Sequence, residues 1–223
     1  MADQLSTGTT PAHPERPHYL PAMGKRWLLP LYDPFTRLAG MRRVHGALLD
    51  RADLGPGQRV LEIGCGTGNL LLLAKRRCPD ADVAGLDPDP AALRHAGRKA
   101  ARAGLAVRLD RGFAADLPYA DGSLDRVLSS FMLHHVEPAE LPLVLREVAR
   151  VLRPGGSFHV VDLAGGHARH GLAGLLARRS RHLTDDSPSR LPALLAEAGL
   201  RDVAETGRGS VKIGDYAFHR AVR

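Results

Sequence analysis

The stretch Val60-Leu61-Glu62-Ile63-Gly64-Cys65-Gly66-Thr67-Gly68-Asn69 decides the fold of this chain. Its first four residues are apolar apart from one glutamate, which is typical of a fully buried strand. The three alternating glycines let the backbone turn sharply and approach a ligand without a Cβ in the way. A helix expected from Thr67 to about Arg77 would direct its unsatisfied N–H groups toward that ligand. The stretch therefore predicts a buried strand, a ligand-binding turn and a helix.

The spacing of the glycines distinguishes between two kinds of nucleoside ligand. The dinucleotide fingerprint Gly-x-Gly-x-x-Gly requires a third glycine where this chain has Asn69. Here the spacing is Gly-x-Gly-x-Gly, and Glu62 stands two residues before the first glycine. A carboxylate at this position would repel a pyrophosphate and attract a cationic group. The pattern therefore disfavours a nucleotide-dependent oxidoreductase.

The rest of the chain predicts further strands that alternate with helices. Residues 82–87 are expected to form the second strand, and Asp89 to cap a helix that has Pro90 in its first turn and stops at Gly104. The later elements are strands at 124–129 and 157–162, helices at 141–151 and 191–198, and a terminal antiparallel pair at 201–206 and 214–222. Residues 152–156, Leu-Arg-Pro-Gly-Gly, are expected to end the helix at 141–151.

Acid-x-Gly-x-Gly-x-Gly at 62–68 resembles the first motif of the class I S-adenosylmethionine-dependent methyltransferases. The order of elements resembles most closely the ubiquinone/menaquinone-biosynthesis type, well over residues 26–162 and loosely elsewhere. The resemblance implies a Rossmann-like, doubly wound α/β sheet of strand order 3-2-1-4-5-7-6, with the last strand antiparallel. It also implies S-adenosyl-L-methionine as cofactor and in-line transfer of its methyl group to oxygen, nitrogen or carbon of a small-molecule acceptor. A noncatalytic regulatory protein that binds the same cofactor is the alternative.

The resemblance also assigns residues to the cofactor. Asp87 would accept the ribose hydroxyls, and Pro88 would lie against the adenine. The full set of expected contacts is Glu62, Gly64, Cys65, Gly66, Thr67, Gly68, Asp87, Pro88, Phe113, Ala114 and Ser130.

One position departs from the family pattern. Relatives commonly carry Gly-Asp-Ala before the Leu-Pro of the loop after the third strand, and the Asp holds the adenine amino group. This chain has Gly112-Phe113-Ala114 there, so a phenylalanine replaces the carboxylate. Either backbone groups near Phe113 and Ala114 hold the adenine together with apolar contact, or Phe113 points into the core and Asp116 takes the missing role.

Two adjacent histidines are the candidates for acid–base chemistry. His134 and His135 follow the fourth strand, at the carboxyl edge where sites of α/β proteins lie. A general base is needed only if the acceptor must lose a proton, and paired histidines also serve to cap loops. Tyr32 and Phe131 are expected on the substrate side of the site. The remaining histidines have no convincing ligand spacing, so no metal is expected.

Composition sets the expected organisation and surroundings. Residues 1–24 are expected to be a flexible tail, and residues 25–223 a single methyltransferase domain, with a cap segment at 25–50 and a variable substrate-side insertion at 163–190. The chain has no apolar run of membrane-spanning length and no signal-peptide core, which predicts a cytoplasmic protein. Its net charge of +7 comes from scattered arginines, with only 4% aromatic residues, so a nucleic-acid partner is not expected. The sequence does not predict the oligomeric state.

Overall fold

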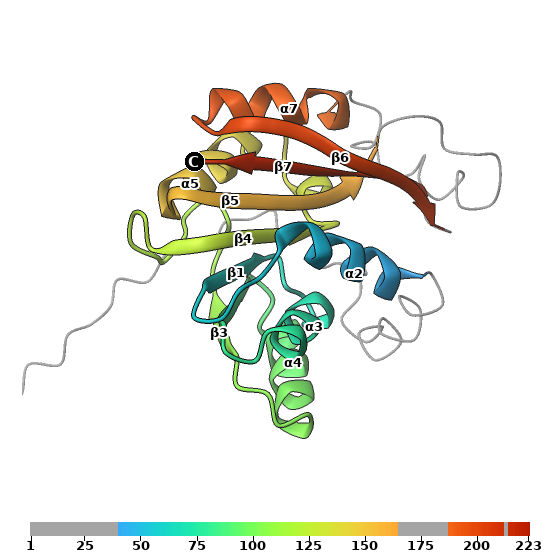
Figure 1. Ribbon diagram of the computed structural model, residues 1–223, viewed down its shortest axis with the longest axis vertical. Helices are drawn as coiled ribbons and strands as arrows, with labels where there is room; N and C mark the ends of the chain where they lie inside the picture. The colour runs from blue at the N-terminus through green and yellow to red at the C-terminus, as the bar shows by residue number, and fades with distance from the viewer. Residues whose placement is uncertain (1–39, 165–186, 212–213) are drawn as a thin grey trace, which may run out of the picture.

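The computed structural model describes residues 40–164, 187–211 and 214–223 (Figure 1). Tyr32, the predicted tail at 1–24, most of the predicted cap at 25–50 and most of the predicted insertion at 163–190 therefore lie outside the described residues. The division of the chain into these parts stays a prediction.

The described residues form a seven-stranded mixed sheet in the order β3-β2-β1-β4-β5-β7-β6. Strands β1 to β5 are parallel, whereas β7 runs antiparallel to both β5 and β6. The predicted strand order and the reversed last strand are confirmed. The strands are β1 (Arg59–Ile63), β2 (Asp82–Asp87), β3 (Arg108–Arg111), β4 (Leu124–Ser130), β5 (Leu152–Leu163), β6 (Arg201–Val211) and β7 (Gly214–Val222).

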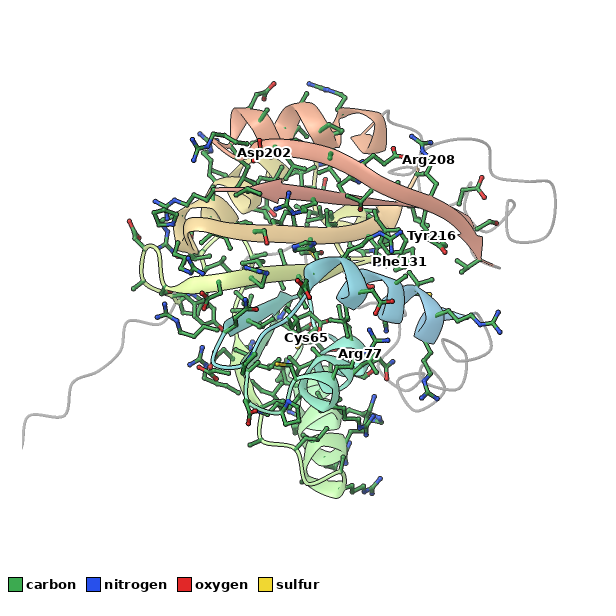
Figure 2. All side chains as sticks on the ribbon, viewed as in Figure 1. Cys65, Arg77, Phe131, Asp202, Arg208 and Tyr216 are labelled. Atoms are coloured by element: carbon green, nitrogen blue, oxygen red, sulfur yellow. The ribbon has the colours of Figure 1, made fainter. Side chains whose placement is uncertain are left out.

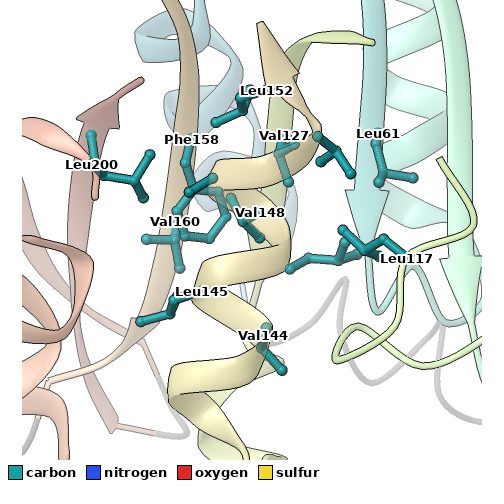
Figure 3. Close-up of a cluster of buried hydrophobic side chains, with 14 of the residues drawn as sticks. Leu61, Leu117, Val127, Val144, Leu145, Val148, Leu152, Phe158, Val160 and Leu200 are labelled. Atoms are coloured by element: carbon teal, nitrogen blue, oxygen red, sulfur yellow. The ribbon is translucent and has the colours of Figure 1, made fainter. Parts of the chain in front are cut away.

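Helices cover both faces of the sheet. On one face, α2 and α3 pack over a cluster that includes Val60 and Leu128. On the other face, α5 and α7 pack over a cluster that includes Leu61 and Val127, as the close-up of α5 shows (Figure 3). Because consecutive strand residues point to opposite faces, the apolar run of β1 supplies both clusters. The helices are α2 (Met41–Ala52), α3 (Asn69–Arg77), α4 (Pro90–Arg102), the short 3₁₀ helix η2 (Leu133–His135), α5 (Leu141–Val151) and α7 (Ser187–Glu197).

The helix boundaries follow from local chemistry. The Asp89 side chain accepts a hydrogen bond from the Ala91 amide at 2.8 Å, with Pro90 in the first turn, so the predicted cap of α4 is confirmed. Helix α3 begins at Asn69, two residues after the predicted start, because Gly68 is left-handed with φ of +78°.

Strand β5 begins earlier than predicted. Residues 152–156 end helix α5 as expected, since the helix stops at Val151, but the strand expected from Ser157 already begins at Leu152, which pairs with Leu124 of β4. A register shift between Leu124 and Arg126 then brings Ser157 into line with the rest of the strand. The predicted strand start was wrong because the pairing of Leu152 with a distant strand has no local signal in the sequence.

Strand β6 forms one edge of the sheet and is irregular. Its register with β7 shifts between Arg201 and Ala204 and again between Glu205 and Gly207. Asp202 has φ of +49°, which a side chain other than glycine rarely adopts. Figure 2 labels Asp202 and Arg208 along this strand.

None of the helices among the described residues has both the length and the apolar character needed to cross a lipid bilayer.

A buried histidine lies in the middle of the sheet. His159 of β5 is 2% exposed, and its Nε2 lies 2.9 Å from Ser157 Oγ. Its Nδ1 has no hydrogen-bond partner within the described part of the chain. Burial lowers the pKa of His159 to about 3, and the nearby charges of Arg126 and Arg220 lower it further. The folded protein therefore keeps this ring neutral, as suits a structural histidine.

We expect this histidine to make the fold sensitive to acid. Between about pH 6.5 and 3 the unfolded chain binds a proton at residue 159 that the folded chain refuses, so stability falls as the pH falls. His159→Gln should flatten this fall by up to about 1.4 kcal/mol per pH unit, as measured by chemical unfolding from pH 8 to pH 4. Equal slopes for the two proteins would contradict the assignment. The pH 8 measurement serves as the control, because the wild-type ring is neutral in both states there.

Candidate functional site

The glycine turn lies at the carboxyl end of β1 and is tied to β2. The amides of Gly64 and Cys65 both donate to the Leu86 carbonyl, at 2.8 and 3.0 Å. Gly64 and Gly66 have φ of +67° and +50°, in the left-handed region that favours glycine. A Cβ at Gly64 would lie 2.2 Å from Met132 Cγ, whereas a Cβ at Gly66 would meet nothing within 4 Å. Gly64 is thus required by packing, whereas Gly66 has space beside it among the described residues.

Asp87 closes one side of this space. It is the last residue of β2 and is 6% exposed. Its Oδ2 accepts a hydrogen bond from the Gly66 amide and its Oδ1 accepts one from the Asp89 amide, both at 2.8 Å. Burial raises the pKa of Asp87, and these two amides partly counteract that effect. Each carboxylate oxygen has a second lone pair, which leaves acceptor capacity for a ligand.

Glu62 lies beneath the turn and is 4% exposed. Burial raises the pKa of Glu62 well above its usual value, and the nearby Asp87 raises it further, whereas the Leu71 amide and Lys99 lower it. Its Oε2 has no hydrogen-bond partner among the residues that the structure describes. A buried polar atom of this kind usually forms a hydrogen bond with water or a ligand.

The residues just after β4 add a second buried polar atom without a partner. Ser130 is the last residue of β4, and its Oγ has no hydrogen-bond partner in the described ranges. Since β4 is the direct neighbour of β1, Ser130 lies on the same sheet edge as the glycine turn. The two orphaned atoms thus belong to residues that the sequence had assigned to cofactor binding.

The remaining turn residues are buried. Cys65 is 4% exposed, and a Cβ at Gly85 would lie 2.8 Å from its Sγ, so the thiol fills the space above β2 (Figure 2). Burial raises the pKa of the Cys65 thiol well above its usual value, which makes it unreactive. Thr67 is 2% exposed, and Gly68 packs so that an added Cβ would lie 3.0 Å from Ala96 Cβ.

The purine side of the expected site is formed by the loop after β3. The Gly112 amide donates to the Asp87 carbonyl at 3.3 Å, which brings the loop beside the ribose carboxylate. Phe113 is 39% exposed, so the alternative that it points into the core is wrong. Ala114 is partly buried against the apolar cluster of α5. Pro88 lies close by, since its carbonyl accepts a hydrogen bond from Arg111 Nε at 3.4 Å.

The loop 131–135 carries the predicted catalytic histidines. Phe131 has φ of +51°, and its ring meets Tyr216 edge-on at a centroid distance of 6.1 Å (Figure 2). Positive φ at a bulky residue costs energy and often marks a functional site. The rings of His134 and His135 lie 4.0 Å apart.

A buried carboxylate fixes this loop: Asp162, for which the sequence left open a place in the pocket or a role in anchoring a loop. Asp162 Oδ1 lies 2.6 Å from His134 Nδ1, and Asp162 Oδ2 accepts from the Leu133 amide at 2.8 Å. The side chain of His134 is 18% exposed and that of Asp162 is 8% exposed. With Nδ1 held by the carboxylate, the free nitrogen of His134 is Nε2. Asp162 ends an apolar strand, which was the available signal, but only the fold brings residues 134 and 162 together.

The site as a whole fits an adenosyl cation better than a diphosphate. Two buried carboxylates, Glu62 and Asp87, face the turn, and open space lies over Gly66. A pyrophosphate would add negative charge to this pair, whereas an ammonium or sulfonium group would offset it. Asn69, where a dinucleotide site has its third glycine, accepts a hydrogen bond from Lys99 Nζ at 2.6 Å. No group of three or more His, Cys, Asp or Glu side chains in the described ranges could hold a metal ion.

Comparison with known proteins agrees with this geometry. Residues 60–156 match the family model described as a methyltransferase domain. The chain is 38% identical over 138 residues to an uncharacterized methyltransferase of Synechocystis sp., covering 60% of this chain and 62% of the relative. It is 36% identical over 142 residues to the demethylmenaquinone methyltransferase of Thermus thermophilus, again covering 60% and 62%. The chain therefore spans less than two thirds of the length of these relatives.

A solved structure shares the fold. The crystal structure of a SAM dependent methyltransferase from Aquifex aeolicus matches with a TM-score of 0.67 at 19% identity, covering 89% of this chain and 99% of that chain. At this identity the likeness concerns the fold alone. Together with the family match, it confirms the resemblance inferred from the sequence.

We expect Gly66→Ala to block ligand binding without unfolding the protein. The new Cβ would enter the open space above the turn, and the left-handed backbone would cost about 1–2 kcal/mol of stability. Gly104→Ala is the matched control, because Gly104 has φ of +63°, also has nothing within 4 Å of an added Cβ, and follows α4 away from the turn. Both variants should lose similar stability in thermal unfolding. Only Gly66→Ala should lose binding of S-adenosylhomocysteine in calorimetry, and equal binding by both would contradict the site.

Proposed function

We propose that this chain, a member of the S-adenosylmethionine-dependent methyltransferase family, moves the methyl group of S-adenosylmethionine to a small organic acceptor. The observation that carries the proposal is the pair of buried carboxylates, Glu62 and Asp87, around a glycine turn in which a Cβ at Gly66 would meet no atom of the described residues within 4 Å. Glu62 would stabilise the cationic end of an adenosyl ligand, and Asp87 would accept its ribose hydroxyls.

The cofactor would be held by the residues of the turn and of the neighbouring strand ends. Asp87 would accept the ribose hydroxyls through the lone pairs left by its two amide donors. Glu62 and Ser130 would supply their unpartnered oxygens to the polar groups of the methionyl part, directly or through water. Pro88, Phe113 and Ala114 would line the adenine.

In methyl transfer, the main task of this chain would be to orient the acceptor relative to the methyl group. When bound, S-adenosylmethionine supplies a methyl group already activated by its positive sulfur. The protein has to hold the acceptor in line with that group, and orientation of this kind is worth roughly 7–11 kcal/mol in well-aligned systems. The rigid backbone of the turn, tied to β2 by Asp87, keeps the cofactor side fixed.

His134 is the residue we assign to removal of the acceptor proton. Asp162 holds its Nδ1 at 2.6 Å, which orients the ring and leaves Nε2 as the proton acceptor. Among the contacts of the described residues, His135 has no such carboxylate partner, and its amide donates to the Met132 carbonyl at 2.9 Å. A base at this position suits any acceptor that loses a proton on methylation, whether the methylated atom is oxygen, nitrogen or carbon.

The wider setting rests on the same proposal. We place the activity in one domain formed by residues 25–223, in the cytoplasm, with Tyr32 and Phe131 on the side of the acceptor. The relative from Thermus thermophilus is named for demethylmenaquinone, which is consistent with a small-molecule acceptor here.

Two measurements test the proposal. Calorimetry should show binding of S-adenosylhomocysteine and none of NAD, and the reverse result would replace the methyltransferase by an oxidoreductase. Incubation with cell extract and S-adenosylmethionine labelled in its methyl group should then transfer label to a small molecule. Binding without any transfer would support the noncatalytic alternative.

We expect Asp87→Ala to abolish most of the cofactor affinity. Loss of charged hydrogen bonds to the ribose should weaken binding of S-adenosylhomocysteine by about 10- to 100-fold, at 1.5–3 kcal/mol for a bond to a charged group. Asp82→Ala is the matched control, since Asp82 lies at the opposite end of β2 and is exposed. The control should bind like the wild type by calorimetry. Wild-type affinity in Asp87→Ala, with an intact circular dichroism spectrum, would remove Asp87 from the site.

We expect His134→Ala to slow transfer without weakening cofactor binding. Loss of a positioned base should lower the rate by about 10²- to 10⁴-fold. His135→Ala, which removes the neighbouring ring but no carboxylate-held nitrogen, should lower the rate far less. Rates of label transfer from S-adenosylmethionine to the small-molecule product found in cell extract would measure both, and equal rates in the two variants would refute the assignment of His134.

A further inference from the structure

We infer that the described residues offer the purine no side-chain acceptor for its 6-amino group, and that the site therefore tolerates alkyl groups on that nitrogen. The inference rests on the proposed function, because it takes the adenosyl cofactor as the ligand. It makes Phe113 the residue that sets specificity for the purine.

The position of Phe113 follows from the backbone around Asp87. Arg111 of β3 pairs with Asp87 of β2, and the next amide, that of Gly112, donates to the Asp87 carbonyl at 3.3 Å. Phe113 thus directly follows Gly112, whose amide is hydrogen-bonded to Asp87, the residue expected to bind the ribose. Its side chain is 39% exposed, so its ring is open to a ligand or to solvent rather than packed into the core.

The carboxylates nearest to this loop are already engaged. Asp110 Oδ2 accepts from Tyr119 Oη at 2.7 Å and from Arg108 Nε at 3.0 Å. Asp89 Oδ1 accepts from the Ala91 amide and caps α4. Both oxygens of Asp87 accept backbone amides and face the turn. These three side chains therefore have structural roles away from the purine amino group.

Asp116 is the remaining carboxylate of the loop. Its amide donates to the Phe113 carbonyl at 3.1 Å, which closes a tight turn over residues 113–116. Asp116 is exposed and makes interactions of its own within the protein. The turn thus places the exposed aromatic side chain of Phe113 next to the strand end that carries Asp87, with Asp116 after it.

This arrangement has a consequence for selectivity. A site with a buried acceptor for the amino group rejects a ligand that lacks the donor, because the acceptor is left unpaired. The side chain of Phe113, which stands where relatives carry a carboxylate, has no hydrogen bond to lose when the purine 6-amino nitrogen carries methyl groups. Aromatic contact with a base is also tolerant of its substituents, because every base has a π-face.

The experiment compares two ligands by calorimetry on the full chain. They are S-adenosylhomocysteine and its N6,N6-dimethyl analogue, which has no N–H donor on the purine amino nitrogen. The wild type should bind both with dissociation constants within a few-fold of each other. Phe113→Asp should restore discrimination and favour the unmodified ligand by about tenfold or more, the cost of one unpaired buried acceptor.

Two further variants make the outcome decisive. Phe113→Ala should weaken both ligands to the same degree, roughly tenfold for the loss of aromatic contact with a base. Asp116→Ala should leave both affinities unchanged, whereas loss of affinity for the unmodified ligand alone would assign the amino group to Asp116 and overturn the inference.

The possible failures are distinguishable. No binding of S-adenosylhomocysteine by the wild type would refute the proposed function itself. Binding of that ligand together with rejection of the dimethyl analogue by tenfold or more would refute only the inference about Phe113. Equal binding of the two ligands by Phe113→Asp would show that residue 113 lies away from the purine amino group.

Discussion

The hydrogen bond from the Gly66 amide to Asp87 is the interaction on which the site depends. It joins the glycine turn after β1 to the end of β2, and the Asp89 amide joins the same carboxylate to the start of α4. One buried side chain thus fixes the turn, the strand end and the helix. Burying Asp87 together with Glu62 disfavours the charged forms of both, and this cost is recovered when a cation enters. The geometry that fixes the glycine turn would therefore also favour a positively charged ligand.

The loop after β4, on the expected acceptor side, is also fixed by a buried carboxylate. Asp162 binds the amide of Leu133 and the ring of His134, so the strained residue Phe131 is followed by a loop with a fixed backbone. A loop held at several points would keep the proposed catalytic nitrogen of His134 in place. In the proposed function, carboxylates at the ends of strands organise both the cofactor side and the acceptor side of the site.

The sequence predicted the features that local patterns encode. The apolar run at 60–63, the alternating glycines and the Asp89-Pro90 cap were sufficient for the strands and helices around the cofactor, and the resemblance to a family supplied the strand order. The start of β5 was wrong because Leu152 joins the sheet through pairing with a distant strand. The contact of His134 with Asp162, 28 residues apart in sequence, has no local signature either. The orientation of Phe113 depends on how its loop is held by Asp87, which the residue type alone does not encode.

The irregular backbone of β6 bears on how copies of this chain could meet. An outermost strand normally offers a row of unpaired amides and carbonyls that recruits another strand. The two register shifts and the left-handed Asp202 break that row, and Arg208 with Glu205 adds charge to it. Extension of the sheet from one molecule into the next across β6 is therefore disfavoured.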